Sequence, residues 1–242
     1  NMSHPDNKGL KSIKFYVTTK YGCGYIENRS AQSMVATPYT SIGSDIYDDL
    51  IYKGFRRSGQ YVYKPHCEEC QECIPIRLSP TLFVISRSQK RVIKKHAHIT
   101  AKILPLQYSE EHYELYINYQ NKRHRSKNDH ENDMTDYHDF LIKSNVQSKL
   151  IEFRDQGKLV MVTIIDEMEN GLSAVYTFYD STNPKDSLGT FSILWLLNYS
   201  LNKKVPYLYL GYWIRKSVKM AYKINFKPYE ILINDLWQEA SE

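Results

Sequence analysis

The sequence predicts an α+β protein made of a smaller, cysteine-containing N-terminal domain and a larger C-terminal domain. The first observation is that every cysteine lies before residue 74, whereas a series of consecutive strands joined by tight turns is predicted from Lys149. The second is a break at Leu104-Pro105, just before a new helix start, which divides the chain into residues 1–104 and 105–242. At 242 residues, the chain is long enough to bury a substantial core.

The N-terminal part contains local signals for two helices and one strand. A short helix from Ser44 is expected to end at Gly54, because glycine readily takes the left-handed conformation that follows a helix. A strand is expected around residues 60–64. A second helix is expected after Ser86, whose hydroxyl can cap the first main-chain N–H groups.

The C-terminal part is expected to begin with two helices. Ser109 is a good N-cap, and the two glutamates that follow it suit the positive end of a helix dipole. Residues 121–134 are polar and aperiodic, which is typical of a loop. Thr135 is then expected to cap a second helix that runs to about Ser144.

An antiparallel meander is expected next, with turns at Gln156-Gly157 and Asn170-Gly171. A largely apolar helix over residues 187–202, a strand over residues 207–211 and a short cationic helix over about residues 215–223 complete the pattern. This order is similar to that of acetyltransferase-like (GNAT-type) acyl-transfer domains. Such domains bind the acyl donor where two central strands splay apart.

The loop that enters the apolar helix departs from the acetyltransferase pattern. Acetyltransferases hold the coenzyme A pyrophosphate there with a glycine-rich loop, whereas residues 186–190 contain one glycine. A single glycine leaves fewer main-chain N–H groups exposed to a pyrophosphate. The sequence therefore favours a donor other than coenzyme A, and it indicates Ser187, Gly189 and Thr190 as substrate-binding residues.

The net charge of +5 is unevenly distributed. Residues 53–96 hold ten Lys or Arg and three Glu, and residues 187–229 hold seven Lys or Arg and no acid. Two basic segments in an otherwise acidic chain are typical of a protein with a polyanionic partner. The helix after Ser86 has a cationic face suited to a phosphate backbone, although a solvated charged helix is the alternative. The cations of this face are Arg87, Lys90, Arg91, Lys94 and Lys95.

The four cysteines are candidate metal ligands. Cys67, Cys70 and Cys73 lie within seven residues, and Cys23 is a remote fourth thiol. Four thiolates are sufficient for a tetrahedral Zn²⁺ or an iron–sulfur cluster. The alternative is a set of reduced structural thiols, and clustering of this kind favours a reducing compartment over a disulfide framework.

An ordered series of motifs covers nearly the whole chain, from about Cys23 to Trp237. It consists of HCEECQECIPIRL, SRSQKR, SAVYTF, DSLGT, PYLYLGYWI and KMAYK. The series resembles the bacterial aspartate/glutamate leucyltransferases, which belong with the arginyl-tRNA–protein transferases of the N-degron pathway. The resemblance implies an acetyltransferase-like fold and the transfer of leucine from leucyl-tRNA to the N-terminal α-amine of proteins that begin with Asp or Glu. The product would be marked for degradation.

This chemistry defines what an acceptor site needs. An α-amine can attack the aminoacyl ester directly, so proximity and a proton acceptor are required but no activated Ser or Cys nucleophile and no cofactor. A cation is needed for the Asp or Glu side chain, and guanidinium binds carboxylate in bidentate fashion. Arg77 and Arg87 are therefore the acceptor-binding candidates, assisted by Ser88 and Gln89; an ordinary ion pair is the alternative for Arg77.

The acid-free C-terminal segment supplies the donor-binding candidates. Tyr209 and Trp213 could stack on the tRNA 3′ end, although either could instead belong to the core. Tyr212, just beyond the predicted strand, is a catalytic candidate, and Asp180 and Glu152 are candidate general bases. The expected tRNA-binding cations are Lys216, Lys219 and Lys223, together with Lys90, Arg91, Lys94 and Lys95 of the basic helix.

Two other functions stay open from the residues alone. One is an arginyl-tRNA–protein transferase with the same acceptors, and the other is a non-catalytic RNA-binding zinc module.

The longest aliphatic-aromatic run is too short to cross a bilayer. We therefore expect a cytoplasmic protein with aminoacyl-tRNA and protein partners, no membrane partner and no coenzyme A.

Overall fold

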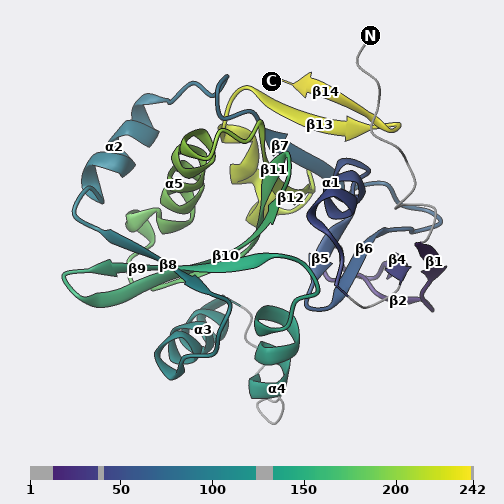
Figure 1. The fold of residues 1–242 in the computed structure, drawn as a ribbon, viewed down its shortest axis with the longest axis horizontal. Helices are drawn as coiled ribbons and strands as arrows, with labels where there is room; N and C mark the ends of the chain where they lie inside the picture. Colours follow the sequence, from purple (N-terminus) through teal and green to yellow (C-terminus); the bar gives the residue numbers. More distant parts are fainter. Residues whose placement is uncertain (1–12, 38–40, 124–132, 241–242) are drawn as a thin grey trace.

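The computed structural model describes residues 13–37, 41–123 and 133–240, and it combines helices with a large mixed sheet (Figure 1). The main sheet has the strand order β14 (Leu236–Ala240), β13 (Tyr229–Ile233), β7 (Ile74–Leu78), β12 (Tyr207–Trp213), β11 (Gly171–Tyr179), β10 (Lys158–Met168), β9 (Ser148–Asp155) and β8 (Thr100–Pro105). A second sheet has the order β1 (Lys14–Val17), β4 (Ser33–Thr37), β6 (Tyr61–Pro65) and β5 (Arg56–Ser58), and β2 (Tyr21–Gly22) pairs with β3 (Ser30–Ala31). The predicted α+β architecture is confirmed.

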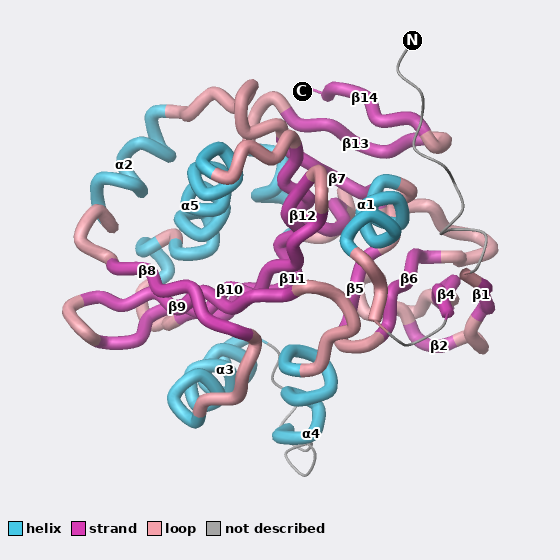
Figure 2. Tube along the Cα trace, in the orientation of Figure 1, coloured by secondary structure: helices cyan, strands magenta, loops and turns pink. Residues whose placement is uncertain are grey.

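Helices cover both faces of the main sheet (Figures 1 and 2). Helix α5 (Leu188–Asn202) packs on β11 and β12, and α2 (Arg87–Lys95) packs on α5. On the other face lie α3 (Glu110–Arg123), α4 (Asp133–Tyr137) and the π-helical segment η2 (His138–Ile142). Helix α1 (Ser44–Tyr52) contacts β10, and two 3₁₀ segments are η3 (Pro184–Asp186) and η4 (Val218–Asn225). None of the helices in the described part of the chain is long and apolar enough to cross a membrane.

Several elements form where the local sequence signals predict them. Gln156 and Gly157 have φ values of 48° and 85°, which is the left-handed turn that joins two twisted antiparallel strands, here β9 and β10. Gly54 has φ 92° just after α1. At α2, the Ser86 hydroxyl accepts a hydrogen bond from the main-chain N–H of Gln89, whose side chain binds back to Ser86. These short-range signals are confirmed.

The long-range arrangement was not apparent from the sequence. Strand β7, which directly follows the cysteine cluster, lies in the middle of the main sheet between β13 and β12. Leu104 and Pro105, the expected boundary, are the last two residues of β8, which pairs with β9 at the edge of the same sheet. The main sheet therefore takes strands from both sides of residue 104.

Two further expectations need correction. The helix expected to be capped by Thr135 begins at Asp133, so Thr135 lies inside α4 rather than at its cap. Residues 215–223 do not form one α-helix; a 3₁₀ segment runs from Val218 to Asn225 instead. The centre of the predicted polar loop, residues 124–132, lies outside the described residues.

A buried ion-pair network joins the small sheet to the main one. Arg57 of β5 binds Asp166 of β10 through two hydrogen bonds of 2.8 Å, and both side chains are fully buried. Tyr47 of α1 and Ser148 of β9 each donate to the same carboxylate at 2.6 Å. Because a buried charge is tolerated only with such partners, this network fixes α1 and β5 against the main sheet.

Candidate functional site

Strands β11 and β12 separate near the centre of the main sheet. They pair in parallel only from Gly171 to Ser173, opposite Tyr207 to Tyr209. Beyond that point β11 continues to Tyr179 beside β10, whereas β12 continues to Trp213 beside β7. Main-chain groups on the facing edges of the two strands are therefore released from the sheet. This is the place where acetyltransferase-like domains were expected to bind their donor.

A bulge at Gly211 lies on the β12 side of this opening. The register between β12 and β7 shifts between Tyr209 and Tyr212, and Gly211 has φ 77°, a conformation that favours glycine. The Gly211 carbonyl accepts a hydrogen bond from the Arg56 guanidinium at 3.0 Å. The Tyr212 carbonyl accepts one from the Lys223 ammonium at 2.6 Å. Two cations, Arg56 of β5 and Lys223 of η4, therefore bind neighbouring carbonyl groups at the bulge.

The side chains around the bulge have strongly perturbed ionisation. Burial, and next the nearby Arg56 charge, lowers the pKa of Lys223 to about 7. Burial raises the pKa of the Tyr212 hydroxyl well above its ordinary value, and this hydroxyl donates to the Gly54 carbonyl at 2.8 Å. Tyr212 therefore stays protonated, whereas Lys223 can change charge near neutral pH.

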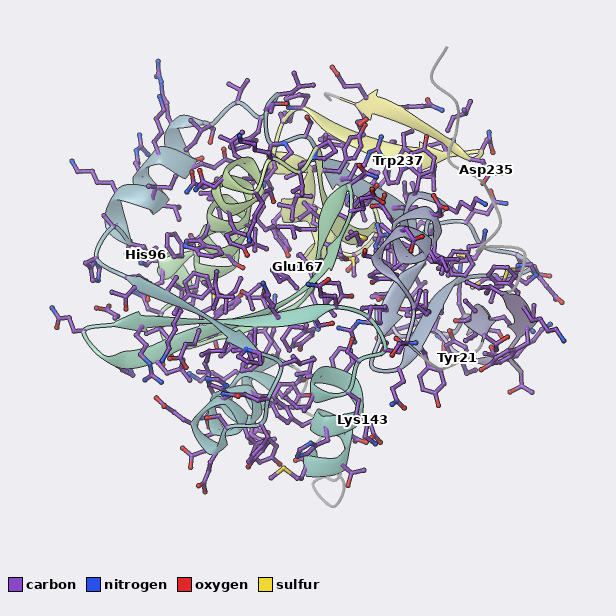
Figure 3. All side chains as sticks on the ribbon, viewed as in Figure 1. Tyr21, His96, Lys143, Glu167, Asp235 and Trp237 are labelled. Carbon is purple, nitrogen blue, oxygen red and sulfur yellow. The ribbon has the colours of Figure 1, made fainter. Side chains whose placement is uncertain are left out.

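The N-terminus of α5 lies at the end of the β11 branch. Ser187 precedes the helix with φ 53° and its side chain makes no cap hydrogen bond. No acidic residue occupies the first turn, so the helix N-terminus keeps its affinity for negative charge. The preceding loop is fixed to α2, because His96 bonds the Asp186 carbonyl and Lys95 pairs with the Asp186 carboxylate at 2.8 Å. Figure 3 labels His96 at the end of α2.

All four cysteines line one cavity of about 510 Å³, which also has Tyr25 and Tyr212 in its wall. Burial, and then the neighbouring thiols of Cys23, Cys67 and Cys70, raises the pKa of Cys73 to about 12. In the part of the chain that the structure describes, no three Cys, His, Asp or Glu side chains are arranged to hold a metal ion. The four thiols therefore share one cavity without being grouped around a metal position, and binding of a metal would have to release their protons.

Comparison with known proteins identifies the family. The model for the arginine-tRNA-protein transferase N terminus matches residues 21–91, and the model for its C terminus matches residues 111–233. The aspartate/glutamate leucyltransferase of Methylobacillus flagellatus is 47% identical over 237 residues, which are 98% of this chain and 96% of that protein. The chain belongs to the aspartate/glutamate leucyltransferase family. The member from Thiobacillus denitrificans is 45% identical over 97% of this chain and 98% of its own length.

The family assignment makes the chain an aminoacyltransferase enzyme. Among solved structures, L-PGS from Bacillus licheniformis aligns with 70% of this chain and 59% of its own at 12% identity, with a TM-score of 0.48. That likeness is too distant to assign roles to residues. The roles of individual residues in this leucyltransferase-family chain are therefore inferred from its own geometry.

Arg77 is not free for an acceptor carboxylate. Its guanidinium binds both oxygens of Glu230 at 3.1 and 3.3 Å, and its remaining nitrogen donates to the Tyr209 hydroxyl at 3.3 Å. It is stacked between the rings of Tyr207 and Trp237, with centroid distances of 3.6 and 4.2 Å. Because the side chain is only 4% exposed, the prediction of a substrate-binding role is replaced by that of a structural ion pair.

Trp237 completes the enclosure of Arg77 from the β13–β14 hairpin. Its indole N–H donates to the Tyr52 carbonyl at the end of α1 at 3.0 Å, and Figure 3 labels it beside that helix. Tyr209 and Trp213, the expected stacking residues, are also buried, at 2% and 8% exposure. Tyr209 belongs to the core around α1 and Trp213 to the core around α5. Neither ring is available to stack on a nucleotide, so both expectations need correction.

The two candidate bases are held in their charged forms. Although burial favours the neutral form of Glu152, hydrogen bonds from Arg154 and His112 lower its pKa. Hydrogen bonds from Thr182 lower the pKa of Asp180. Glu152 is on β9, packed toward α3 and three strands away from β12. A carboxylate stabilised in this way is a weak base, so neither geometry supports the predicted catalytic role.

The side chains of the basic helix α2 include a buried structural residue and an exposed cationic set. Gln89 is buried in the capping box and donates to the Asn225 carbonyl at 3.0 Å, so it serves structure rather than substrate. Ser88 is exposed and bonds only the adjacent Ser86 hydroxyl among the described groups. The cations that face solvent, as predicted for a phosphate-binding surface, are Arg87, Lys90, Arg91, Lys94 and Lys95.

The other predicted tRNA contacts lie near η4. Lys216 is exposed near Glu72, Lys219 is exposed on η4, and the Lys223 ammonium points inward to the bulge.

Arg56 is a further buried cation at this site, and no sequence pattern predicts it. It is 5% exposed, and it binds the Phe55 and Gly211 carbonyls, while its Nε has no hydrogen-bond partner within the described segments. Its guanidinium lies 5.5 and 5.4 Å from the ring centroids of Tyr209 and Tyr212. The sequence shows two adjacent arginines, Arg56 and Arg57, just after Gly54. It does not show that Arg57 forms an ion pair with Asp166 whereas Arg56 does not bind a carboxylate among the described residues.

Proposed function

We propose that this chain transfers leucine from leucyl-tRNA to the N-terminal α-amine of proteins that begin with Asp or Glu. The observation that carries the proposal is the match to relatives named aspartate/glutamate leucyltransferase along nearly the full length of both proteins. The product, with leucine at its N-terminus, would be a degradation signal. Because charged tRNA is the donor, we place the reaction in the cytoplasm.

The reaction proceeds by direct transfer. The neutral α-amine attacks the ester carbonyl of leucyl-tRNA, and the new C–N bond forms as the bond to the tRNA 3′ oxygen breaks. The amine loses a proton and the 3′ oxygen gains one, so the step balances without a cofactor. About a tenth of a free α-amine is neutral at pH 7, which makes proximity the main contribution required of the protein.

The opening between β11 and β12 is the place where we put the aminoacyl ester. The strands stop pairing after Ser173 and Tyr209, and the N-terminus of α5 at Ser187, Gly189 and Thr190 faces the end of the β11 branch. A helix N-terminus with no acid in its first turn stabilises the phosphate or the developing oxyanion of the donor. The single glycine of the loop supports the aminoacyl-tRNA over coenzyme A.

The tRNA body would lie over α2. Its solvent-facing cations form one surface, and only Lys95 has a carboxylate partner among the described side chains. Exposed Lys216 lies just before η4 and exposed Lys219 lies on it, and η4 packs on β12. A backbone of phosphates that spans α2 and η4 would therefore pass beside the opening between the strands.

The cysteine set is proposed to act in structure or regulation, not in the transfer itself. The four cysteines line the same cavity as Tyr212. Oxidation of the thiols or metal binding to them would therefore take place next to the β12 bulge. Elemental analysis of anaerobically purified protein tests whether zinc or iron binds. One metal or cluster per chain supports ligation by these cysteines if Cys73→Ser abolishes it. Metal-free, fully active protein would contradict it.

A competition assay separates leucine from arginine as the transferred amino acid. Purified protein, total tRNA, both labelled amino acids and their synthetases are mixed with a peptide that begins with Asp. We expect leucine to enter the peptide in large excess, since the relatives carry the leucyltransferase name. Preferential entry of arginine would contradict the proposed donor, and RNA binding without any transfer would contradict the enzyme.

A further inference from the structure

We propose that Arg56 and Lys223 bind the side-chain carboxylate of the acceptor's N-terminal Asp or Glu and thereby determine acceptor specificity. The proposal rests on the function proposed above. It assigns to these two residues the role that the sequence suggested for Arg77, and it moves Lys223 from tRNA binding to acceptor recognition.

Unlike the buried Arg57 and Arg77, these two cations have no counter-charge among the residues that the structure describes. Arg57 is paired with Asp166 and Arg77 with Glu230. In the described ranges, neither Arg56 nor Lys223 has a carboxylate partner; Arg56 binds two main-chain carbonyls and Lys223 binds a third, besides a long contact to the Met220 sulfur. Two like charges that share a poorly solvated place are unfavourable together, and an anion from the substrate would relieve that cost.

The Arg56 guanidinium retains donors for a ligand. Its Nε is buried and has no hydrogen-bond partner in residues 13–37, 41–123 and 133–240, although buried polar groups are almost always satisfied. The rings of Tyr209 and Tyr212 and the carbonyl of Gly211 hold the group in one position. Such an oriented guanidinium is suited to a planar carboxylate.

Lys223 provides the second cation of the pair, and its ammonium points inward to the Tyr212 carbonyl. It is half-buried, in contrast to Arg56, and its ammonium lies 3.7 Å from the point where a Cβ on Gly211 would be. Burial and the Arg56 charge lower the pKa of Lys223 to about 7, which is the response expected of a cation without an anion beside it. A bound carboxylate would restore its charge.

The position suits the chemistry of an N-terminal acidic residue. The side-chain carboxylate and the α-amine of Asp are separated by only two carbon atoms, and those of Glu by three. A carboxylate held at the Gly211 bulge therefore keeps the amine at the mouth of the β11–β12 opening, where the ester is proposed to lie. The flexible lysine side chain can follow the extra methylene of Glu.

The test compares Lys223→Met with a matched control, Lys203→Met, which removes an exposed lysine at the end of α5. For each protein, KM is measured for a peptide beginning with Asp and separately for leucyl-tRNA. Wild-type transfer to this peptide is measured first, so a failure of the proposed function is seen before any variant is interpreted. We expect Lys223→Met to raise the peptide KM by about tenfold or more, the size typical of a lost charge-assisted hydrogen bond, with the tRNA KM changed less than twofold.

Two results would overturn the assignment. An unchanged peptide KM would show that no carboxylate binds Lys223, and a parallel rise in both KM values would assign the cations to tRNA phosphate. A second measurement on the wild type does not depend on a variant folding. The Asp peptide should raise the melting temperature measurably, whereas the same peptide with N-terminal Asn should not, and equal shifts would contradict carboxylate recognition.

Discussion

Arg77→Met is the substitution that best separates structure from substrate binding in this chain. It keeps an unbranched apolar stem but removes the two hydrogen bonds to Glu230 and the bond to Tyr209. Glu230, with a side chain 26% exposed, would be left without its cation. Loss of one partner of a partly buried pair costs about 2–4 kcal/mol. For a protein of this size, that corresponds to a decrease in melting temperature of roughly 5–15 °C.

The assay combines urea denaturation with steady-state kinetics. We expect Arg77→Met to lower the free energy of unfolding by the amount above while the KM for an Asp peptide changes less than twofold at a temperature where the variant is folded. The double variant Arg77→Met with Glu230→Leu should recover part of the stability, because it removes the unpaired carboxylate. A tenfold rise in peptide KM with unchanged stability would refute the structural assignment and restore Arg77 as the acceptor-binding residue.

Three further predictions concern the buried network, the tRNA surface and the pH dependence. Asp166→Ala leaves the fully buried Arg57 unpaired and should lower the free energy of unfolding by about 3–5 kcal/mol, as measured by urea denaturation; a loss below 1 kcal/mol would contradict the role of the network. Replacing exposed Lys90 and Lys94 by Gln should raise the KM for leucyl-tRNA and reduce the slope of log binding constant against log salt by roughly 1–2, with the peptide KM unaffected. Because the Lys223 pKa is lowered to about 7 by burial and Arg56, its charge is lost as pH rises, so the wild-type peptide KM should increase from pH 6.5 to 8.5. Lys223→Arg should remove this increase, and identical pH profiles would contradict it.

The local elements were predictable because their signals are short-range. The Gln156-Gly157 turn needs two adjacent residues with positive φ, and the start of α2 needs a Ser and a Gln three residues apart. The position of β7 in the middle of the main sheet depends on pairing with β12 and β13, which lie more than 120 residues later. No local pattern encodes such a pairing.

The candidate site was predicted in part for the same reason. The acid-free segment includes β12 and η4, but which of its side chains face the interior depends on the bulge at Gly211. The bulge breaks the alternation of sides along β12, and both Tyr209 and Tyr212 are buried. Likewise, Arg77 and Glu230 are 153 positions apart, so the ion pair that occupies Arg77 could not be seen in the sequence.

The cysteines illustrate how far spacing alone can lead. Their clustering suggested that Cys23 returns to the other three, and all four do line one cavity. The spacing could not give the directions of the sulfur atoms, and in the described structure they do not converge on a metal position. The fold therefore shows that the four thiols lie near one another, and elemental analysis tests separately whether they bind a metal.

The most direct test of the central claim is the transfer of radiolabelled leucine from purified leucyl-tRNA to matched peptides that differ only in their first residue. We expect label to enter the peptides with N-terminal Asp and Glu, at least tenfold less label to enter the peptides with Asn and Gln, and prior digestion of the tRNA to abolish transfer. Equal labelling of acidic and amide peptides, or labelling from free leucine without tRNA, would contradict the claim.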